Sequence, residues 1–271
     1  MAIKRDFKGK VVVITGAAGG MGMALSRRFG TAGARIAVTD VDVGAVQEFS
    51  ETLTSEGIEN IGIGLDVTDE VACKRAMDEI ADHFGGIDLL INNAGITHRS
   101  AFENTDSAVY KRVMDVNYFG SLYSTKSALP QLMKNKGQII VMSSIAGFSP
   151  LLGRTGYSAS KHALHGFFDS LRAELKNRGI GITIVCPGFT ATNIERNALD
   201  GDGRPTTHPQ SRIGKTATPE SVAEAVYQAA CREKRLLVLS KVGRLTRILM
   251  RCSPCLYEWI MVRSLKSELE R

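Results

Sequence analysis

Short apolar runs recur along the chain and alternate with longer amphipathic stretches. Nearly every run is apolar throughout, which is typical of parallel strands that are buried on both faces. The intervening segments are long enough to form crossover helices. The pattern therefore predicts a single-domain α/β fold, a doubly wound parallel sheet of about seven strands with helices on both faces. The predicted strands are VVVIT (11–15), RIAVT (35–39), NIGIGLDV (60–67), IDLLIN (87–92), QIIVM (138–142), GITIVC (181–186) and RLLVLS (235–240).

The sheet pattern ends near residue 240, and a different kind of segment follows it. We expect one domain over residues 1–240, which includes a long irregular substrate loop at 189–218. In a compact domain, a loop of this length usually acts as a lid or a mobile binding segment. Residues 241–271 combine apolar residues with Arg and Lys, which predicts a basic amphipathic helical extension. Pro254 is expected to divide this tail into two helices.

The composition fits a globular protein without a membrane span or an export signal. Of the 271 residues, 44% are hydrophobic and 23% are charged, close to the averages for soluble domains. No run approaches the roughly 18 consecutive apolar residues of a spanning helix, and the N-terminus lacks the apolar core of a signal peptide. Five scattered cysteines fit reduced thiols. We therefore expect a cytoplasmic protein, with peripheral membrane contact through 241–271 left open.

Charge and cysteine placement exclude two further classes of function. Residues 241–271 hold seven Lys and Arg against three Glu, so the tail carries +4 of the net charge of +6. The rest of the chain is nearly balanced, and we expect no nucleic-acid partner. Cys252 and Cys255 form a lone CxxC pair, whereas a structural zinc site needs four ligands. We therefore expect no bound metal.

A glycine-rich loop follows the first predicted strand. The segment TGAAGGMG, at 15–22, leads from that strand into the predicted helix MALSRRFGTAG. Its glycines allow a tight turn and a close approach of the backbone to a ligand, and the helix N-terminus offers N–H groups to a pyrophosphate. The strand, loop and helix together predict a dinucleotide site. Its candidate residues are Gly16, Gly19, Gly20, Met21 and Gly22.

Asp40 ends the second predicted strand, about 20 residues after the glycine loop. A carboxylate at this position can accept hydrogen bonds from ribose hydroxyls and would repel the 2′-phosphate of NADP, which favours NAD over NADP. No basic residue lies within the loop, although Arg27 and Arg35 are close enough in sequence to be considered as counter-charges. The alternative is that Asp40 only caps the following helix.

Seven motifs, found in a fixed order, carry a resemblance to a known family. They are TGAAGGMG (15–22), LDVTD (65–69), NNAG (92–95), VNYFG (116–120), VMSSIAG (141–147), YSASK (157–161) and PGFTAT (187–192). From residue 8 to about residue 240, the chain resembles the short-chain dehydrogenase/reductase family, the branch with a TGxxxGxG loop and a YxxxK motif. The resemblance implies a Rossmann-like fold, a nicotinamide dinucleotide cofactor and hydride transfer. It also implies a homodimer or homotetramer.

The resemblance also implies cofactor contacts beyond the glycine loop. Asp66 and Val67 would contact the adenine, and Thr190 and Thr192 would meet the nicotinamide carboxamide. The other implied cofactor residues are Asn93, Ala94, Gly95, Pro187 and Gly188. For Asn92 and Asn93 a structural role remains open, because both can serve as hydrogen-bonding devices at the end of a strand.

The YSASK motif places a tyrosine and a lysine four residues apart. A helix over 155–175 would bring Tyr157 and Lys161 to one face. A free tyrosine has a pKa near 10, and lowering this pKa by about three would need about 4 kcal/mol. Lys161 and the positive nicotinamide of an oxidised cofactor are the expected sources. Tyr157 is then the general acid/base, and Lys161 also holds the nicotinamide ribose, so both residues are cofactor contacts as well.

Two further residues complete the implied catalytic set. Ser144 lies thirteen residues before Tyr157 and would hydrogen-bond the substrate oxygen. The adjacent Ser143 is the competing candidate, and the family spacing selects Ser144. By resemblance, Asn117 would hold a helix irregularity and a water that relays protons towards Lys161.

The predicted substrate pocket is apolar. By family analogy it takes a hydrophobic secondary alcohol or ketone, of a sterol-like, lipid or aromatic kind, and the enzyme is an NAD-dependent alcohol dehydrogenase or carbonyl reductase. Its candidate residues are Phe148, Leu151, Phe189 and Ile194. Two alternatives remain open. One is a 3-oxoacyl thioester reductase, which usually prefers NADPH, and the other is a non-catalytic dinucleotide-binding sensor.

Histidines near the motifs and the tail have several possible roles. His98 and Arg99 follow NNAG and could reach the substrate entrance, whereas His162 and His165 are expected to be surface or packing residues. The tail can pack on the domain, contact a partner subunit, cover the substrate cleft or lie on an anionic membrane.

Overall fold

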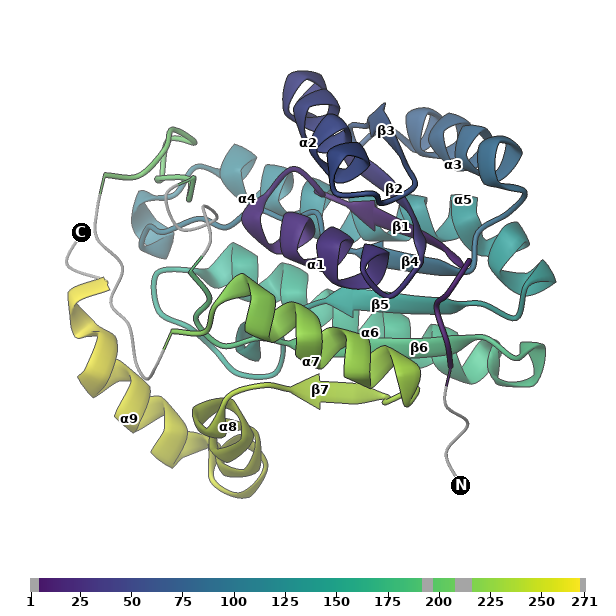
Figure 1. The fold of residues 1–271 in the computed structure, drawn as a ribbon. Helices are drawn as coiled ribbons and strands as arrows, with labels where there is room; N and C mark the ends of the chain where they lie inside the picture. Colours follow the sequence, from purple (N-terminus) through teal and green to yellow (C-terminus); the bar gives the residue numbers. More distant parts are fainter. Residues whose placement is uncertain (1–4, 192–196, 208–215, 269–271) are drawn as a thin grey trace.

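The computed structural model describes residues 5–191, 197–207 and 216–268 and contains a sheet of seven parallel strands (Figure 1). The strands lie side by side in the order β3-β2-β1-β4-β5-β6-β7. This order confirms the predicted doubly wound α/β sheet. The strand bounds are β1 (Val11–Thr15), β2 (Arg35–Asp40), β3 (Asn60–Gly64), β4 (Leu89–Asn92), β5 (Gln138–Met142), β6 (Gly181–Cys186) and β7 (Leu236–Val238).

Helices cover both faces of this sheet (Figure 1). Alternate side chains of β1 face opposite sides of the sheet, because successive side chains of a strand point in opposite directions. Val12 and Ile14 pack in the layer of α1, α2 and α7, whereas Val11 and Val13 pack in the layer of α3, α5 and α6. The helix bounds are α1 (Gly20–Gly30), α2 (Val43–Ser55), α3 (Glu70–Phe84), α4 (Ser107–Met114), α5 (Gly120–Lys134), α6 (Thr155–Glu174) and α7 (Pro219–Cys231).

The strand order changes direction between β1 and β4. In open α/β sheets, ligands bind at this switch point, outside the carboxyl ends of the strands. β1 ends at Thr15 and β4 ends at Asn92, so both strands deliver their following loops to the same edge of the sheet. The fold therefore brings together the glycine loop and the NNAG motif, which are far apart in sequence.

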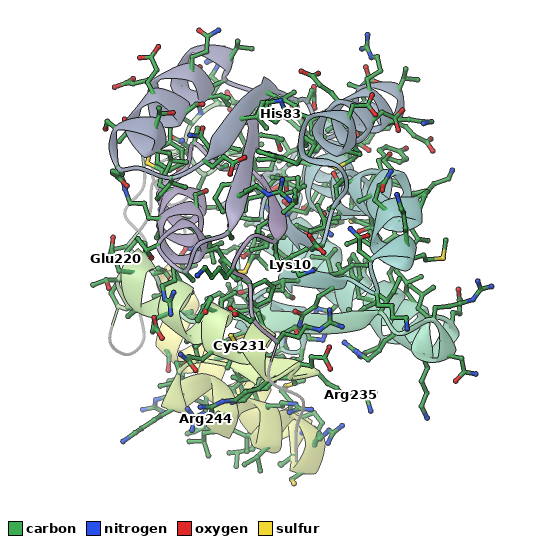
Figure 2. The ribbon with its side chains drawn as sticks, turned by 45° about the vertical axis from the view of Figure 1, so that its right-hand side comes forward. Lys10, His83, Glu220, Cys231, Arg235 and Arg244 are labelled. Atoms are coloured by element: carbon green, nitrogen blue, oxygen red, sulfur yellow. The ribbon has the colours of Figure 1, made fainter. Side chains whose placement is uncertain are left out.

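Two helices follow the last strand, α8 (Lys241–Cys252) and α9 (Pro254–Leu265). Ser240 caps α8 because its hydroxyl accepts a hydrogen bond from Gly243 N at 2.8 Å. Pro254 is the first residue of α9, which confirms the predicted division of the tail. Figure 2 shows both helices at the lower end of the molecule, where Arg235 and Arg244 also lie.

The second tail helix returns to the body of the protein. The Tyr257 hydroxyl donates a hydrogen bond to Pro150 O at 3.1 Å, in the segment that follows β5. Met261 and Leu265 are buried on the same side of α9. Among the described residues, no helix combines the length and the apolar character that crossing a membrane requires.

Candidate active site

The glycine loop begins where β1 ends, and two of its glycines have no room for a side chain. Gly16 has φ 64°, and a Cβ on it would lie 2.8 Å from the Cα of Ala94. A Cβ on Gly22 would lie 2.4 Å from Gly16 O. Gly19 stands in the N-cap position of α1 and provides no side-chain cap, so the first-turn N–H groups remain available for a phosphate. The loop therefore fits a pyrophosphate.

Asp40 connects the end of β2 to this loop. Its carboxylate accepts a hydrogen bond from Ala18 N at 3.1 Å. Asp42, and not Asp40, caps the next helix, because Asp42 accepts from Ala45 N at 3.0 Å. The capping explanation for Asp40 is therefore wrong, and its carboxylate lies beside the loop that would hold the dinucleotide.

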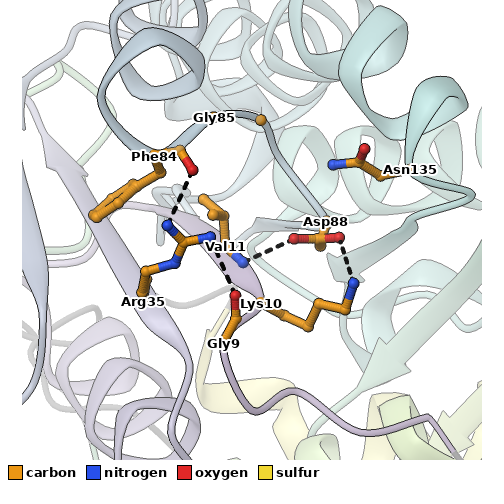
Figure 3. Close-up of a pocket in the computed structure, with 9 residues that line it drawn as sticks. Gly9, Lys10, Val11, Arg35, Phe84, Gly85, Asp88 and Asn135 are labelled. Atoms are coloured by element: carbon orange, nitrogen blue, oxygen red, sulfur yellow. Dashed lines mark hydrogen bonds and ion pairs between the residues drawn. The ribbon is translucent and has the colours of Figure 1, made fainter.

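The two arginines considered as counter-charges for NADP are engaged elsewhere. Arg27 forms an ion pair with Glu56 at 2.8 Å. Arg35 begins β2, at the opposite end of the strand from Asp40, and donates to Phe84 O at 3.0 Å (Figure 3). Neither side chain therefore offsets the negative charge of Asp40.

The cavity shown in Figure 3 contains no residue of the glycine loop in its lining. It has a volume of about 380 Å³ and lies at the amino-terminal edge of the sheet. Asp88 accepts hydrogen bonds there from Val11 N and from Lys10, at 3.0 and 3.1 Å. Because these polar groups satisfy one another, the cavity is a structural junction between strands.

The NNAG motif holds the glycine loop against the central strand. Asn93 donates from Nδ2 to Thr15 O at 3.0 Å and to Gly16 O at 2.9 Å. The backbone N–H groups of Asn93 and Ala94 both donate to the Thr15 hydroxyl at 3.1 Å. Asn92 is buried and donates to Thr125. The structural role that the sequence left open is therefore present for both asparagines.

The two predicted adenine contacts lie after β3. The Asp66 carboxylate accepts from the backbone N–H and the hydroxyl of Thr68, at 2.9 and 2.8 Å. Val67 is buried against Gly120, where a Cβ would lie 2.6 Å from its side chain. The cofactor roles of Asp66 and Val67 stay predictions.

Helix α6 carries the tyrosine and the lysine of YSASK, and it ends one residue before the helix predicted from sequence at 155–175. Lys161 is buried, with 4% of its surface exposed, and its Nζ donates to Met142 O at 2.9 Å. The same Nζ lies 5.7 Å from the ring centroid of Tyr157. A Cβ on Gly95 would lie 3.4 Å from this nitrogen, so the YSASK lysine reaches the NNAG loop.

The protein environment changes the acidity of both groups in the direction that burial dictates. Burial lowers the pKa of the Lys161 ammonium to about 8. Burial also raises the pKa of Tyr157, and the hydrogen bond from Ser144 and the charge of Arg154 oppose this effect only in part. We expected Lys161 and an oxidised nicotinamide together to lower the pKa of the tyrosine. In the protein alone burial has the larger effect, and the Lys161 ammonium donates to Met142 O.

The two serines after β5 have different positions. Ser143 is buried and its hydroxyl donates to Lys161 O at 3.4 Å. Ser144 is half-buried, accepts from Ala146 N at 3.2 Å and lies close enough to Tyr157 to lower its pKa. The structure thus brings Ser144, and not Ser143, to the tyrosine.

Asn117 lies in an irregular helical segment, the π-helix Asp115–Phe119 between α4 and α5. Its amide is fully buried and is satisfied by protein groups. The oxygen accepts from Ile96 N at 2.8 Å, and the nitrogen donates to Ile96 O and to the Ser160 hydroxyl, each at 2.9 Å. The expected helix irregularity is therefore present, whereas the proton-relaying water stays a prediction.

His98 and His165 are packing residues, whereas His162 is exposed on the surface of α6. His98 is fully buried and accepts a hydrogen bond from Gly156 N at 2.9 Å, and burial and the charge of Arg154 lower its pKa to about 4. Its neighbour Arg99 is also buried, so neither residue stands open at an entrance as we considered. Burial likewise lowers the pKa of His165 to about 4.

The candidate substrate residues are only partly described. Phe148 packs against His165, with ring centroids 6.2 Å apart, and Leu151 and Phe189 are half-buried. Ile194 lies outside the described residues, as does Thr192. The substrate loop is described at 189–191, 197–207 and 216–218. A role for Phe148, Leu151, Phe189 and Ile194 in one pocket stays a prediction.

The segment after β6 completes the cofactor candidates. The hydroxyl of Thr190 donates to Gly188 O at 3.3 Å. A Cβ on Gly188 would lie 3.2 Å from the Ser240 side chain, so this turn packs closely against the start of α8. The cofactor roles of Pro187, Gly188 and Thr190 stay predictions.

Sequence reasoning missed the residues through which the C-terminal tail reaches this region. A Cβ on Gly153 would lie 3.0 Å from Glu268 O, and Arg154 acts on the pKa of Tyr157. Nothing in the local sequence pairs Glu268, which follows α9, with residues a hundred positions earlier.

Within the described ranges there is also no group of His, Cys, Asp and Glu that could hold a metal ion.

Comparison with known proteins identifies the family. A family model described as short chain dehydrogenase matches residues 10–202. Dehydrogenase/reductase SDR family member 7B of Xenopus tropicalis is 36% identical over 266 residues, which cover 95% of this chain and 86% of that protein. The Bos taurus protein of the same name is 37% identical, over 85% of this chain and 73% of its own.

A solved structure gives the same result. The crystal structure of a short chain dehydrogenase/reductase from Burkholderia phymatum in complex with NAD superposes with a TM-score of 0.82. It is 26% identical and covers 91% of this chain and 94% of its own. The match to the family model, the relatives above 30% identity and the shared fold agree. The chain belongs to the short-chain dehydrogenase/reductase family, whose members are oxidoreductases.

Proposed function

We propose that this oxidoreductase uses NAD(H) to interconvert a hydrophobic secondary alcohol and its ketone. The observation that carries the proposal is the meeting of three side chains beside the dinucleotide loop. Lys161 Nζ lies 5.7 Å from the ring centroid of Tyr157, and Ser144 lies close enough to the same tyrosine to lower its pKa. The NNAG loop joins this group to the glycine loop, through Ala94 on one side and Gly95 on the other.

The fit of the glycine loop supports NAD as the cofactor. The backbone at Gly16 and Gly22 leaves no room for side chains, and the N-terminus of α1 offers free N–H groups to the pyrophosphate. The nicotinamide of NAD, when bound, accepts or supplies the hydride. The other residues proposed to hold the cofactor are Gly19, Gly20, Met21, Asp66, Val67, Asn93, Ala94, Gly95, Tyr157, Lys161, Pro187, Gly188, Thr190 and Thr192.

Asp40 supports NAD over NADP. Its carboxylate lies beside the loop, where it can accept hydrogen bonds from the ribose hydroxyls and would repel a 2′-phosphate. Arg27 and Arg35 are occupied elsewhere. The Burkholderia phymatum relative was solved with NAD, which agrees with this choice.

The proton moves through Tyr157. Its raised pKa keeps the phenol protonated in the protein alone, which suits donation to a ketone oxygen during reduction. During alcohol oxidation, the positive charge of Lys161 favours the phenolate that accepts the hydroxyl proton. Ser144 holds the substrate oxygen in reach of the phenol. Asn117 positions the loop at Ile96 through two hydrogen bonds.

An apolar substrate follows from Phe148, Leu151, Phe189 and Ile194, and sterol-like, lipid and aromatic alcohols are the classes to test. A 3-oxoacyl thioester reductase is the second enzymatic candidate, but such enzymes usually use NADPH, which Asp40 disfavours. A non-catalytic sensor would bind the dinucleotide without requiring Ser144 to lie beside Tyr157.

The remaining proposals concern organisation. We propose that residues 1–240 form the catalytic domain and that 241–271 form a separate extension. All five cysteines are free thiols, which agrees with a reducing, cytoplasmic location. Assembly as a homodimer or homotetramer is proposed from the family alone.

A panel of secondary alcohols and ketones tests the function. Sterols, fatty alcohols and aromatic alcohols are offered with NAD and NADP in parallel, and turnover is measured by nicotinamide absorbance. We expect turnover of at least one apolar class with NAD. Turnover with 3-oxoacyl thioesters and NADPH alone would instead favour the second candidate. Binding of NAD without turnover of any compound would favour the sensor.

A further inference from the structure

Four arginines line a second cavity, which lies between α6, the start of β7 and α8. The cavity has a volume of about 560 Å³. Arg172 comes from α6, Arg235 precedes β7, and Arg247 and Arg251 come from α8. The catalytic residues Tyr157 and Ser144 do not line this cavity.

The positive charge in this cavity is mostly uncompensated. Its acidic lining residue, Asp169, forms an ion pair with Arg172. Arg172 is held further by hydrogen bonds to the carbonyl oxygens of residues 182 and 235, at 3.0 and 3.3 Å. Across the described parts of the chain, Arg235, Arg247 and Arg251 take part in no ion pair. Three arginines therefore remain to attract an anion.

The chemistry of this lining suits a phosphate group that carries an apolar chain. Planar guanidinium groups bind phosphate oxygens through paired hydrogen bonds. The rest of the lining includes Phe148, Leu236 and Met250, which give the cavity apolar walls. A phosphorylated amphiphile satisfies both halves of the cavity, whereas a fully polar anion would leave the apolar walls unused.

The tail next to the cavity exposes large apolar side chains. Leu245 and Ile248 of α8 are 65% and 61% exposed, and Trp259 of α9 is 59% exposed. We call the exposed large apolar residues of these helices the tail surface: Val242, Leu245, Ile248, Leu256, Trp259, Ile260 and Val262. An interfacial helix has such an apolar face together with basic residues.

Charge complementarity favours an anionic membrane over a second copy of the chain. α8 carries Lys241, Arg244, Arg247 and Arg251 and no acidic residue. Symmetric pairing of two copies through α8 would bring these like charges together, which costs free energy. An anionic bilayer instead attracts them, with about 1 kcal/mol for each Lys or Arg near the surface.

We propose that the tail surface docks on an anionic phospholipid bilayer and that the arginine cavity takes the phosphate of one lipid headgroup. The docked helices would lie next to the segment after β5, because Tyr257 bonds to Pro150 and α8 packs on Ile145 through Gly243. If the proposed function holds, an apolar substrate would then reach the site from the membrane. The docking itself does not depend on that function.

Trp259 provides a direct test, because it is the single tryptophan of the chain. The intact protein is mixed with vesicles of phosphatidylcholine, with or without phosphatidylserine. We expect a blue shift of tryptophan emission, quenching by brominated lipid, and co-flotation with the anionic vesicles alone, all weakened by salt. Co-flotation without any change in Trp259 emission would show that another surface binds, and would overturn the proposal.

Two double variants distinguish the contribution of headgroup binding by the arginines from that of the apolar contact with the membrane. Arg247→Gln/Arg251→Gln is expected to weaken vesicle binding about 30-fold, from about fivefold for each charge. Removing two exposed arginines elsewhere, Arg75→Gln/Arg112→Gln, is the matched control and should have little effect. Leu245→Gln/Ile248→Gln should also weaken vesicle binding, while the thermal unfolding midpoint confirms that each variant is folded.

Calorimetry with inorganic phosphate and glycerol phosphate distinguishes the possible sources of the phosphate. We expect weak binding of these soluble groups that is lost in Arg247→Gln/Arg251→Gln and kept in Leu245→Gln/Ile248→Gln. Tight binding of soluble phosphates without vesicle binding would identify a free ligand and refute membrane docking. The tail surface would be a subunit interface if the wild type were an oligomer that does not bind vesicles and Leu245→Gln/Ile248→Gln were a monomer. That result would also refute membrane docking.

Discussion

Replacing Lys161 with methionine is expected to stabilise the protein at neutral pH while removing its activity. The lysine is almost completely buried, with 4% of its surface exposed, and burial lowers the pKa of its ammonium from 10.5 to about 8. At pH 7 this difference corresponds to about 3 kcal/mol of unfavourable free energy for the charged group in the folded protein. Methionine has a similar length and no charge, so it removes that cost.

The lost hydrogen bond of the lysine offsets part of this gain. Nζ donates to Met142 O at 2.9 Å, and losing such a bond costs about 1 kcal/mol. We therefore expect Lys161→Met to raise the free energy of unfolding by about 2 kcal/mol at pH 7.

The pH dependence has a definite sign. Because the folded pKa is lower than the unfolded pKa, the unfolded chain binds more protons between about pH 8 and 10.5. The contribution of Lys161 to the wild-type free energy of unfolding therefore rises with pH across this window. The difference in the free energy of unfolding between Lys161→Met and wild type should shrink over the same window.

Urea unfolding at neutral pH and near pH 10 measures both effects. Lys111→Met, on the exposed surface of α4, is the matched control and should leave stability almost unchanged at both pH values. A Lys161→Met protein that is less stable than wild type at pH 7, or whose advantage does not vary with pH, would refute this account of the buried ammonium.

Three further substitutions test the site. Gly22→Ala should weaken NAD binding at least about tenfold, because its Cβ would lie 2.4 Å from a backbone oxygen. Gly166→Ala is the control in the same titration and should bind NAD normally, because there is open space around Gly166. Asp40→Ala should raise the ratio of NADP to NAD kcat/KM at least about tenfold, and Asp42→Ala, which removes only a helix cap, should leave that ratio unchanged. Ser144→Ala should lower kcat about 100-fold or more with little change in NAD affinity.

The local part of the fold and the site could be predicted from sequence. The β-strands follow from apolar runs, and the helix predicted at 155–175, observed at Thr155–Glu174, follows from the spacing of its apolar residues. Gly16 and Gly22 could be identified because they lie in a glycine-rich loop between a predicted strand and a predicted helix. Each of these predictions uses residues that are close together in the chain.

Properties that depend on distant contacts could not be predicted. Burial raises the pKa of Tyr157, and the Lys161 ammonium donates to a carbonyl of β5 that no motif indicates. From the sequence His98 could reach the substrate entrance after NNAG, yet it is buried and accepts a hydrogen bond from Gly156 N of α6. The arginine cavity likewise draws on α6, β7 and α8, whose sequences give no sign that they meet.

The most direct test of the account is the turnover of an apolar secondary alcohol by wild type and by Tyr157→Phe, with NAD binding measured on the same samples. The phenyl ring keeps the packing of the tyrosine and removes the hydroxyl that carries the proton. We expect Tyr157→Phe to bind NAD as wild type does and to lose turnover by a factor of about 100 to 10,000. Equal turnover of the two proteins, under conditions where wild type is active, would contradict the assigned chemistry.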